Sequence, residues 1–213
     1  EGVELQIVEM SDYIKPNLAL SDKDVDANLF QHKPYLDKFV ADRGLKLSAV
    51  ADLYLAPLRV YSKQVKNLAD LPAGAIIAIP NDPTNGGRAL LVLEQAGLIK
   101  LREGAGLQAT ARDIVENPKN IKIKEIEAPQ LPRSLDDVGA AVINTNYAVQ
   151  AGLKPTQDAI FSEQSTSPYV NVLVVRTGDE NRPEIQKLIA ALKAPESRKF
   201  IETTFSGTII PVF

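Results

Sequence analysis

The sequence predicts an α/β fold in which mostly parallel sheets are covered by helices on both faces. Apolar runs of strand length, such as residues 75–80 and 140–143, alternate along the chain with segments of helical apolar spacing. Hydrophobic residues make up 45% of the 213 residues, which is enough for real cores in one large domain or two small ones. The pattern restarts after the polar segment 63–72, where we expect the chain to cross between two lobes.

The part of the chain before that crossing carries strand and helix signals in turn. Residues 3–7 alternate apolar and polar side chains, which indicates a strand. Pro16 and Pro34 suit the first turns of two helices, and Gly44 is the expected end of the second. Two strands are expected next, over residues 45–50 and 53–61.

Beyond the crossing, the buried strand 75–80 leads into a helix over residues 85–96. Thr84 is the expected N-cap of that helix, and Gly97 is the expected residue just past its end. The remaining expected elements are a short helix near 109–116, a strand over 121–126, a helix over 130–137, a strand over 140–143, a helix over 144–150, a turn-rich segment over 154–168, a strand over 171–176, and helices over 182–192 and 195–205.

Composition excludes several classes of function. The chain has no Cys and only one histidine, His32, which excludes disulfides, thiolate chemistry and a His-based zinc site. We expect no metal and no cofactor, because the sequence also lacks a P-loop and a dinucleotide-binding fingerprint. The net charge of -3, without long runs of either sign, argues against nucleic acid as a partner. No apolar stretch approaches the length of a membrane span.

The run NDPTNGGR, residues 81–88, is the most informative segment. It would bring the chain from a strand to a helix N-terminus, where backbone amides and the positive end of the helix dipole favour anions. Gly86 and Gly87 are expected to let a ligand approach the backbone, and Arg88 adds a planar set of donors. These features suit a small carboxylate. A plain helix cap with a surface arginine is the alternative, and on this segment alone it is the stronger one.

Polar residues also follow both buried strands. Arg88 comes after the strand 75–80, and Asn144 comes directly after the strand 140–143. Ligands of open α/β sheets bind outside the carboxyl ends of strands. We therefore expect Arg88 and Asn144 to lie at the same edge of one sheet.

Seven longer segments carry an independent signal. They are DANLFQHKPYL (26–36), PNDPTNGGR (80–88), GLIKL (97–101), ENPKN (116–120), EAPQLPRSLDD (127–137), AVINTNYA (141–148) and SPYVN (167–171). Together and in this order they resemble the methionine-binding lipoproteins of bacterial ABC importers, the NlpA type. Several long strings in one order form a more specific signal than a single short motif.

The resemblance implies a type II periplasmic-binding-protein fold with the ligand in the cleft between two lobes. The family layout assigns residues 1–64 and 167–213 to lobe 1 and residues 65–166 to lobe 2. Such a protein is not an enzyme: it captures free methionine, L-methionine by preference, and delivers it to an inner-membrane ABC permease and its ATPase. It is expected in the periplasm or at the cell surface, where a lipid anchor holds it to the membrane.

The resemblance also implies a set of ligand-binding residues. The family's pocket positions correspond to Arg88, Asn144, Asn171, His32, Tyr35, Phe30, Asn85 and Tyr13. Arg88 would bind the ligand carboxylate bidentately, helped by amides near Asn85. Asn144 and Asn171 would offer oxygens to the ammonium group and amide donors to the carboxylate. The three aromatic residues and His32 would line the side-chain pocket, and no second cation is expected to serve an acidic ligand side chain.

Structural roles compete with each of these assignments. Taken alone, Phe30 and Tyr35 suit core packing, and His32 suits a structural hydrogen bond. Asn144 and Asn171 lie at expected strand ends, where asparagine commonly serves a turn. Two alternative functions also remain: a binding protein for another small amino acid or short peptide that acts as a sensor or surface antigen, and an enzyme on the same scaffold.

The family pattern begins with a lipid-modified Cys, a strand and a helix for which this sequence has no counterpart. The absent strand would occupy a central position in the sheet of lobe 1, beside residues 3–8. Unpaired backbone groups at such an edge favour aggregation. The resemblance therefore implies that the natural molecule is longer or that another chain fills this position.

Overall fold

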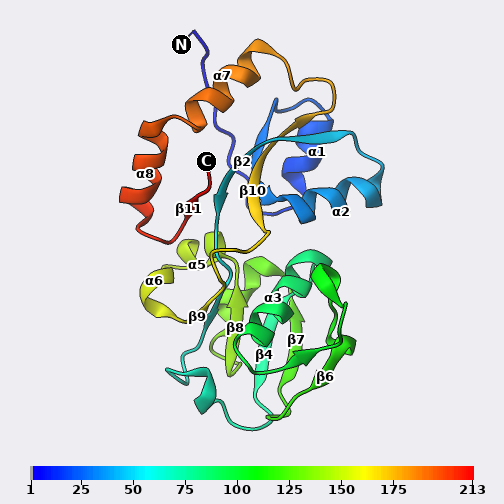
Figure 1. Ribbon diagram of the computed structural model, residues 1–213, viewed down its shortest axis with the longest axis vertical. Coiled ribbons are helices and arrows are strands. Elements are labelled where there is room, and N and C mark those ends of the chain that lie inside the picture. The colour runs from blue at the N-terminus through cyan, green and yellow to red at the C-terminus, as the bar shows by residue number, and fades with distance from the viewer. Residues whose placement is uncertain (1) are drawn as a thin grey trace. The chain divides into compact units, whose positions relative to one another are not determined.

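The computed structural model describes residues 2–213, which form two compact units (Figure 1). Unit 1 comprises the described residues up to Ala56 together with Ser167–Phe213, and unit 2 comprises Pro57–Thr166. The sequence analysis assigned residues 57–64 to the first lobe, but the structure places them in unit 2. The reason is that the strand β3 (Arg59–Tyr61) pairs with β8 (Ala140–Ile143) and β9 (Ala159–Ser162).

Unit 1 is built on a four-stranded sheet. Its strand order is β1 (Asn28–His32), β10 (Val170–Arg176), β2 (Leu47–Leu55) and β11 (Ile210–Pro211). Every neighbouring pair is antiparallel, so the expectation of a mostly parallel sheet is wrong for the described part of this unit. The central strand β10 comes from the distant C-terminal part of the chain and runs opposite to both β1 and β2. The crossover connections that would join parallel neighbours are therefore not needed here.

Four helices flank this sheet. They are α1 (Lys15–Ser21), α2 (Lys33–Arg43), α7 (Pro183–Leu192) and α8 (Pro195–Phe205), and all four agree with the expected helices (Figure 1). Leu20 of α1 and Leu36 of α2 pack with Val172 and Val174 in a buried cluster. Val172 and Val174 are two residues apart on β10 and therefore face the same side of the sheet.

The strand expected over residues 3–7 is absent. Residues 2–10 have no regular secondary structure, and Leu5 and Ile7 are 63% and 77% exposed. The alternating pattern is that of a strand, but a strand forms only when another strand pairs with it. None of the pairings among the described residues involves this segment.

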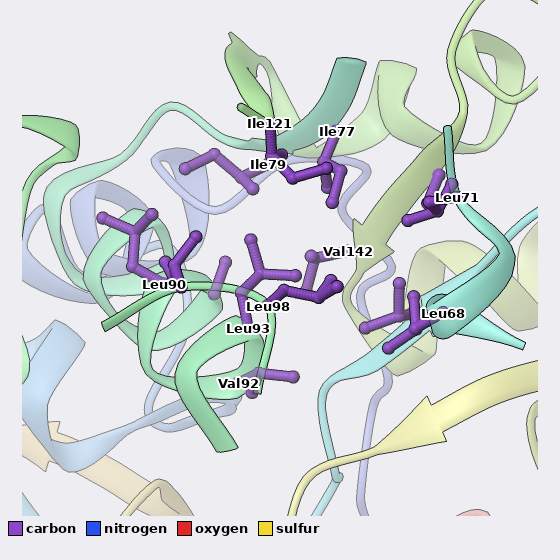
Figure 2. Packing of buried hydrophobic residues seen from close by; sticks show 14 of the residues in the cluster. Leu68, Leu71, Ile77, Ile79, Leu90, Val92, Leu93, Leu98, Ile121 and Val142 are labelled. Atoms are coloured by element: carbon purple, nitrogen blue, oxygen red, sulfur yellow. The ribbon is translucent and has the colours of Figure 1, made fainter. Parts of the chain in front are cut away.

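Unit 2 is built on a five-stranded mixed sheet. Its order is β7 (Lys122–Ile126), β4 (Ile76–Pro80), β8, β3 and β9. The first three strands are parallel, as predicted, while β3 is antiparallel to both of its neighbours. The helix α3 (Pro83–Gln95) covers this sheet, and Figure 2 shows Leu90 and Leu93 beside Ile79 and Val142 in the buried cluster.

Short elements complete unit 2. They are β5 (Lys100–Leu101), β6 (Ile114–Glu116), α4 (Leu131–Ser134), α5 (Thr145–Gln150), α6 (Pro155–Asp158) and 3₁₀ turns at Leu68–Asp70, Gly106–Gln108, Ala111–Asp113 and Ala128–Gln130. The helix expected near 109–116 is therefore wrong. Thr110 and Asp113 cap a single 3₁₀ turn, and the chain then pairs with β5 as the strand β6. The strand predicted over 53–61 is also divided, since β2 ends at Leu55 and β3 joins the other sheet.

The topology of unit 2 brings four strand ends to one edge of the sheet. Because β4 and β8 are parallel, their carboxyl ends lie together, at Pro80 and Ile143. Arg59 at the start of β3 is paired with Ile143, and Ser162 at the end of β9 is paired with Arg59. The loops that follow β4, β8 and β9 therefore meet there. Among residues 2–213, no helix is long and apolar enough to cross a lipid bilayer.

Candidate ligand-binding site

The N-terminus of α3 is capped by Asp82, not by Thr84 as predicted. Asp82 has an extended backbone, and its carboxylate accepts hydrogen bonds from the backbone N–H of Asn85 at 2.9 Å and the hydroxyl of Thr84 at 3.0 Å. The side-chain amide of Asn85 also donates to both oxygens of Asp82, at 3.0 and 2.9 Å. The Asn85 backbone amide expected to meet a ligand anion thus already binds a carboxylate of this chain. The end of the helix agrees with prediction, since Gly97 follows the C-cap with a φ of 71°.

Gly86 and Gly87 serve packing inside unit 2. A Cβ atom at Gly87 would lie 2.5 Å from the carbonyl oxygen of Leu107, and one at Gly86 would lie 3.0 Å from that of Pro80. The two glycines therefore allow α3 to approach the protein's own backbone. The prediction that they open the backbone to a ligand is wrong, because those positions already face protein atoms.

Arg88 is fully enclosed and forms a bidentate ion pair. Its Nε donates to Oε1 of Glu163 at 2.9 Å and its Nη2 donates to Oε2 at 2.5 Å, and both side chains are 3% exposed. The backbone N–H of Leu58 donates to the same Oε2 at 2.9 Å. The alternative of a surface arginine is thus excluded. Glu163 was missed because it lies in a stretch that shows only turn signals, directly after the unpredicted strand β9.

Asn144 lies at the carboxyl end of β8, as its sequence position predicted. Its side-chain NH₂ donates to Oδ1 of Asn85 at 3.0 Å, which joins two of the predicted site residues. Asn144 is 7% exposed, and its Oδ1 is buried without a hydrogen-bond partner. A buried carbonyl oxygen without a partner is costly, so the position suits a donor brought by a ligand.

Arg59 is a second buried cation at the same edge, which the sequence analysis did not anticipate. It is 4% exposed, and its Nη1 donates to Oγ1 of Thr145 at 3.2 Å. Thr145 in turn donates to the carbonyl oxygen of Pro57 at 2.7 Å. Burial lowers the pKa of Arg59 below its usual value, and the charges of Tyr61 and Glu163 offset only part of this effect. The residue was hidden in the sequence because it falls within a run expected to be a strand.

Unit 1 carries the second group of predicted residues. His32 caps the N-terminus of α2: its Nδ1 accepts from the backbone N–H of Tyr35 at 3.1 Å. An accepting Nδ1 means that a neutral ring carries its proton on Nε2. The hydroxyl of Tyr35 donates to the backbone oxygen of Tyr13 at 2.9 Å, which ties the segment before α1 to α2.

The aromatic residues of this group lie together. The ring centroids of Tyr13, Phe30 and Tyr35 are 5.9 to 6.1 Å apart in all three pairings. The ring of His32 lies 6.1 Å from that of Tyr35 and 4.9 Å from that of Tyr169. Tilted and edge-on rings at such distances attract one another. These rings therefore form one aromatic cluster in unit 1.

Asn171 lies on β10 next to that cluster. It is paired with His32 of β1 and with Tyr54 of β2, and its amide lies 3.4 Å from the carbonyl oxygen of Phe30. Burial raises the pKa of Tyr54, and a side-chain hydrogen bond with Asn171 lowers it. Tyr54 was not among the predicted site residues, because the pairing of β2 with β10 that brings it opposite Asn171 cannot be read from local sequence.

The predicted residues therefore form two groups with different chemistry. Unit 2 gathers Arg88, Asn85 and Asn144 with Glu163 and Arg59, a buried polar set with two cations and one anion. Unit 1 gathers Tyr13, Phe30, His32, Tyr35 and Asn171, an aromatic set with one amide. Among residues 2–213, no group of three or more His, Cys, Asp or Glu side chains is arranged to hold a metal ion.

Comparison with known sequences finds one family. A model of the family described as NlpA lipoprotein matches residues 1–213. The chain is 52% identical over 206 residues to a Vibrio cholerae protein named probable D-methionine-binding lipoprotein MetQ, and the match covers 97% of this chain and 77% of the relative. It is 50% identical over 208 residues to the D-methionine-binding lipoprotein MetQ of Escherichia coli, with the same two coverages of 97% and 77%.

Solved structures give the same result. A nutrient-binding protein from Burkholderia cenocepacia bound to methionine superimposes with a TM-score of 0.96 at 51% identity, covering 100% of this chain and 89% of that one. A periplasmic substrate-binding protein of an ABC transporter from Coxiella burnetii gives a TM-score of 0.95 at 45% identity, with coverages of 99% and 89%. These similarities confirm the predicted α/β substrate-binding-protein fold.

Proposed function

Because the chain belongs to the NlpA lipoprotein family, we propose that it captures free methionine and delivers it to an ABC transporter for import. The observation that carries this proposal is the buried polar set of unit 2. Arg88 supplies a cation, and Asn144 supplies a buried oxygen that lacks a donor. An amino acid brings a carboxylate for the first and an ammonium group for the second.

We assign the ligand's groups to the predicted residues as follows. The guanidinium of Arg88, whose Nε and Nη2 donate to Glu163, binds the ligand carboxylate together with Asn85. Asn144 and Asn171 bind the ammonium group. Tyr13, Phe30, His32 and Tyr35 surround the thioether side chain, where each sulfur–aromatic contact contributes about 0.3–1.5 kcal/mol.

The partners and location of the protein follow from the same proposal. It passes its ligand to an inner-membrane permease driven by an ATPase, and it works in the periplasm or at the cell surface, where a lipid anchor holds the full-length precursor. It catalyses no reaction. The second candidate is a sensor or surface antigen that binds another small amino acid or a short peptide, for which the same polar set would serve.

Mass spectrometry of the ligand released by denaturation tests the proposal directly. We expect unmodified methionine from the purified protein. Calorimetry after ligand removal then compares L-methionine, D-methionine, leucine and glutamate, and we expect L-methionine to bind most tightly. Equal or tighter binding of glutamate would overturn the assignment. Chemically altered methionine in the extract would point to an enzyme instead.

Uptake separates a transporter component from a sensor. Cells that lack their own methionine-binding protein would be supplied with the full-length precursor and given labelled methionine. We expect uptake to be restored, and to fail with a variant that cannot bind methionine. Binding without uptake would favour the sensor.

A further inference from the structure

The polar set of unit 2 holds more charge than a carboxylate site needs. Arg59, Arg88 and Glu163 are all buried at the same edge of the sheet, and Glu163 interacts electrostatically with both arginines. Burying an ion is costly unless a partner compensates it. A site that needed only one positive charge for its ligand would require neither Glu163 nor the second arginine.

Glu163 occupies the positions on Arg88 that a ligand carboxylate would otherwise take. The Nε and Nη2 atoms of Arg88 both donate to it, in the bidentate geometry typical of arginine–carboxylate pairs. The backbone N–H of Leu58 fixes Oε2 from another direction. The guanidinium plane of Arg88 is thus oriented by the protein before any ligand arrives.

Asp82, whose carboxylate binds Asn85 at the start of α3, is a second anion at this edge, so the two arginines and the two carboxylates balance. That balance fits a zwitterionic ligand, and the negative charge of Glu163 also favours a nearby ammonium group. Without Glu163, the excess positive charge would favour ligands with more negative charge. Low-dielectric surroundings make such differences larger than they would be in water.

We propose that Glu163 is a positioning residue for Arg88 and, with Arg59, sets the charge of the site so that it selects zwitterionic amino acids over anionic analogues. The proposal rests on the proposed function, because it takes methionine as the ligand. It adds that the discrimination resides in two residues outside the predicted binding set.

The test uses two ligands that differ at one group. L-Methionine is a zwitterion, and its 2-hydroxy analogue keeps the side chain and the carboxylate but lacks the ammonium charge. The measured quantity is the ratio of the two dissociation constants, obtained by calorimetry. For Glu163→Gln we expect this ratio to shift at least tenfold in favour of the hydroxy acid, while methionine binding weakens.

Matched variants separate charge from shape. Glu163→Asp keeps the charge and should leave the ratio within about threefold of the wild-type value. Arg59→Gln removes the other charge and should shift the ratio the opposite way, toward methionine. The double variant Arg59→Gln/Glu163→Gln restores the wild-type net charge and should return the ratio toward wild type, although the anchor of Arg88 is lost.

The outcomes distinguish this inference from the proposed function. If the wild-type protein does not bind methionine, the proposed function fails and this inference fails with it. If the wild type binds methionine and Glu163→Gln leaves the ratio unchanged, only the role of Glu163 is wrong. If Glu163→Gln does not fold, Arg59→Gln provides the test. A ratio of the two dissociation constants that does not shift toward methionine in Arg59→Gln would overturn the proposal that the charge of the site sets selectivity.

Discussion

At the scale of single residues, the ion pair of Arg88 and Glu163 matters for two properties: the stability of the fold and the proposed binding of the ligand. Two ions that are 3% exposed compensate each other, so removing one leaves the other buried without that compensation. The effect of a substitution at Arg88 on binding therefore cannot be read without a measurement of folding. Apolar replacement of both partners avoids the orphaned charge.

We expect Arg88→Ala to lower the free energy of unfolding by about 3–5 kcal/mol, because Glu163 would remain buried without its partner. Denaturant titration followed by circular dichroism measures this loss. The double variant Arg88→Met/Glu163→Met should recover part of the stability, since Arg59 then loses the charge of Glu163, and should still fail to bind methionine in calorimetry. Binding within a few-fold of wild type in the double variant would show that Arg88 does not hold the carboxylate.

Asn144 offers a second test at this scale. Hydrogen bonds to charged groups contribute about 1.5–3 kcal/mol, so Asn144→Ala should weaken methionine binding roughly tenfold to a hundredfold. Asn146→Ala, at an exposed position two residues further along α5, serves as the control and should bind normally. Unchanged affinity in Asn144→Ala would mean that its buried oxygen does not meet the ligand.

At the scale of secondary-structure elements, the close packing of α3 depends on its glycines. Alanine favours a helix over glycine by roughly 1 kcal/mol, so a helical Gly→Ala change is stabilising where space allows. At Gly87 the new methyl group would lie 2.5 Å from the oxygen of Leu107, and at Gly86 it would lie 3.0 Å from that of Pro80. Neither neighbour is a flexible side chain.

We therefore expect Gly87→Ala to be clearly destabilising and Gly86→Ala to be much milder. The measurement is the midpoint of thermal unfolding for each variant and the wild type. A Gly87→Ala protein as stable as Gly86→Ala would mean that the segment near Leu107 moves aside easily.

Unit 1 contains an ion-pair cluster that should respond to pH. Hydrogen bonds from Arg182 and Arg176 hold the pKa of Asp26 below its usual value of 3.8. A depressed pKa in the folded state stabilises the protein above the unfolded pKa, and this contribution disappears as the pH falls through the folded pKa. The contribution is small, since the Asp26 side chain is 67% exposed.

We expect Asp26→Asn to unfold at a lower temperature than the wild type at pH 7, and the gap to close as the pH falls below about 4. Added salt should narrow the gap at pH 7. Asp24→Asn, at an exposed neighbouring position, is the control. A gap that persists at pH 2 would show that Asp26 acts through something other than its charge.

At the scale of the whole molecule, each unit has its own sheet and its own buried cluster. The proposed binding residues are divided among both units, with the aromatic set in unit 1 and the charged set in unit 2. A ligand that binds the native state alone stabilises it by mass action. If one ligand uses both sets, both units must gain protection when it binds.

Methionine at about 100 times its dissociation constant should add about 2.7 kcal/mol to the free energy of unfolding. Hydrogen exchange should slow both in β10 of unit 1 and in α3 of unit 2. Leucine at the same concentration is the control and should protect less. Slowing in one unit alone would mean that the other set of predicted residues does not contact the ligand.

Local signals in the sequence were sufficient for much of the fold. Proline at the first turn located the start of α2, glycine after the last residue located the ends of α2 and α3, and continuous apolar runs located β4 and β8. These features act over a few residues, so the sequence alone reveals them. The position of Asn144 after β8, at the edge where ligands of such sheets bind, was predictable for the same reason.

Long-range pairing decided what the sequence could not. The sheet of unit 1 is antiparallel because β10 pairs with β1 and β2, which are distant from it in the chain. The alternating residues 3–7 form no strand, because no described strand pairs with them. Asp82 rather than Thr84 caps α3, a choice between two capable side chains that the backbone geometry settles.

The sequence by itself determined the family, the α/β class and the residue types of the proposed binding set. Only the tertiary structure decided which charges compensate one another. Glu163 lies 75 residues from Arg88 in the chain, and the unpredicted strand β9 brings it to the edge where β4 and β8 end. The physical reason is that local propensity acts within a few residues, whereas the partner of a buried ion is set by the pairing of distant strands.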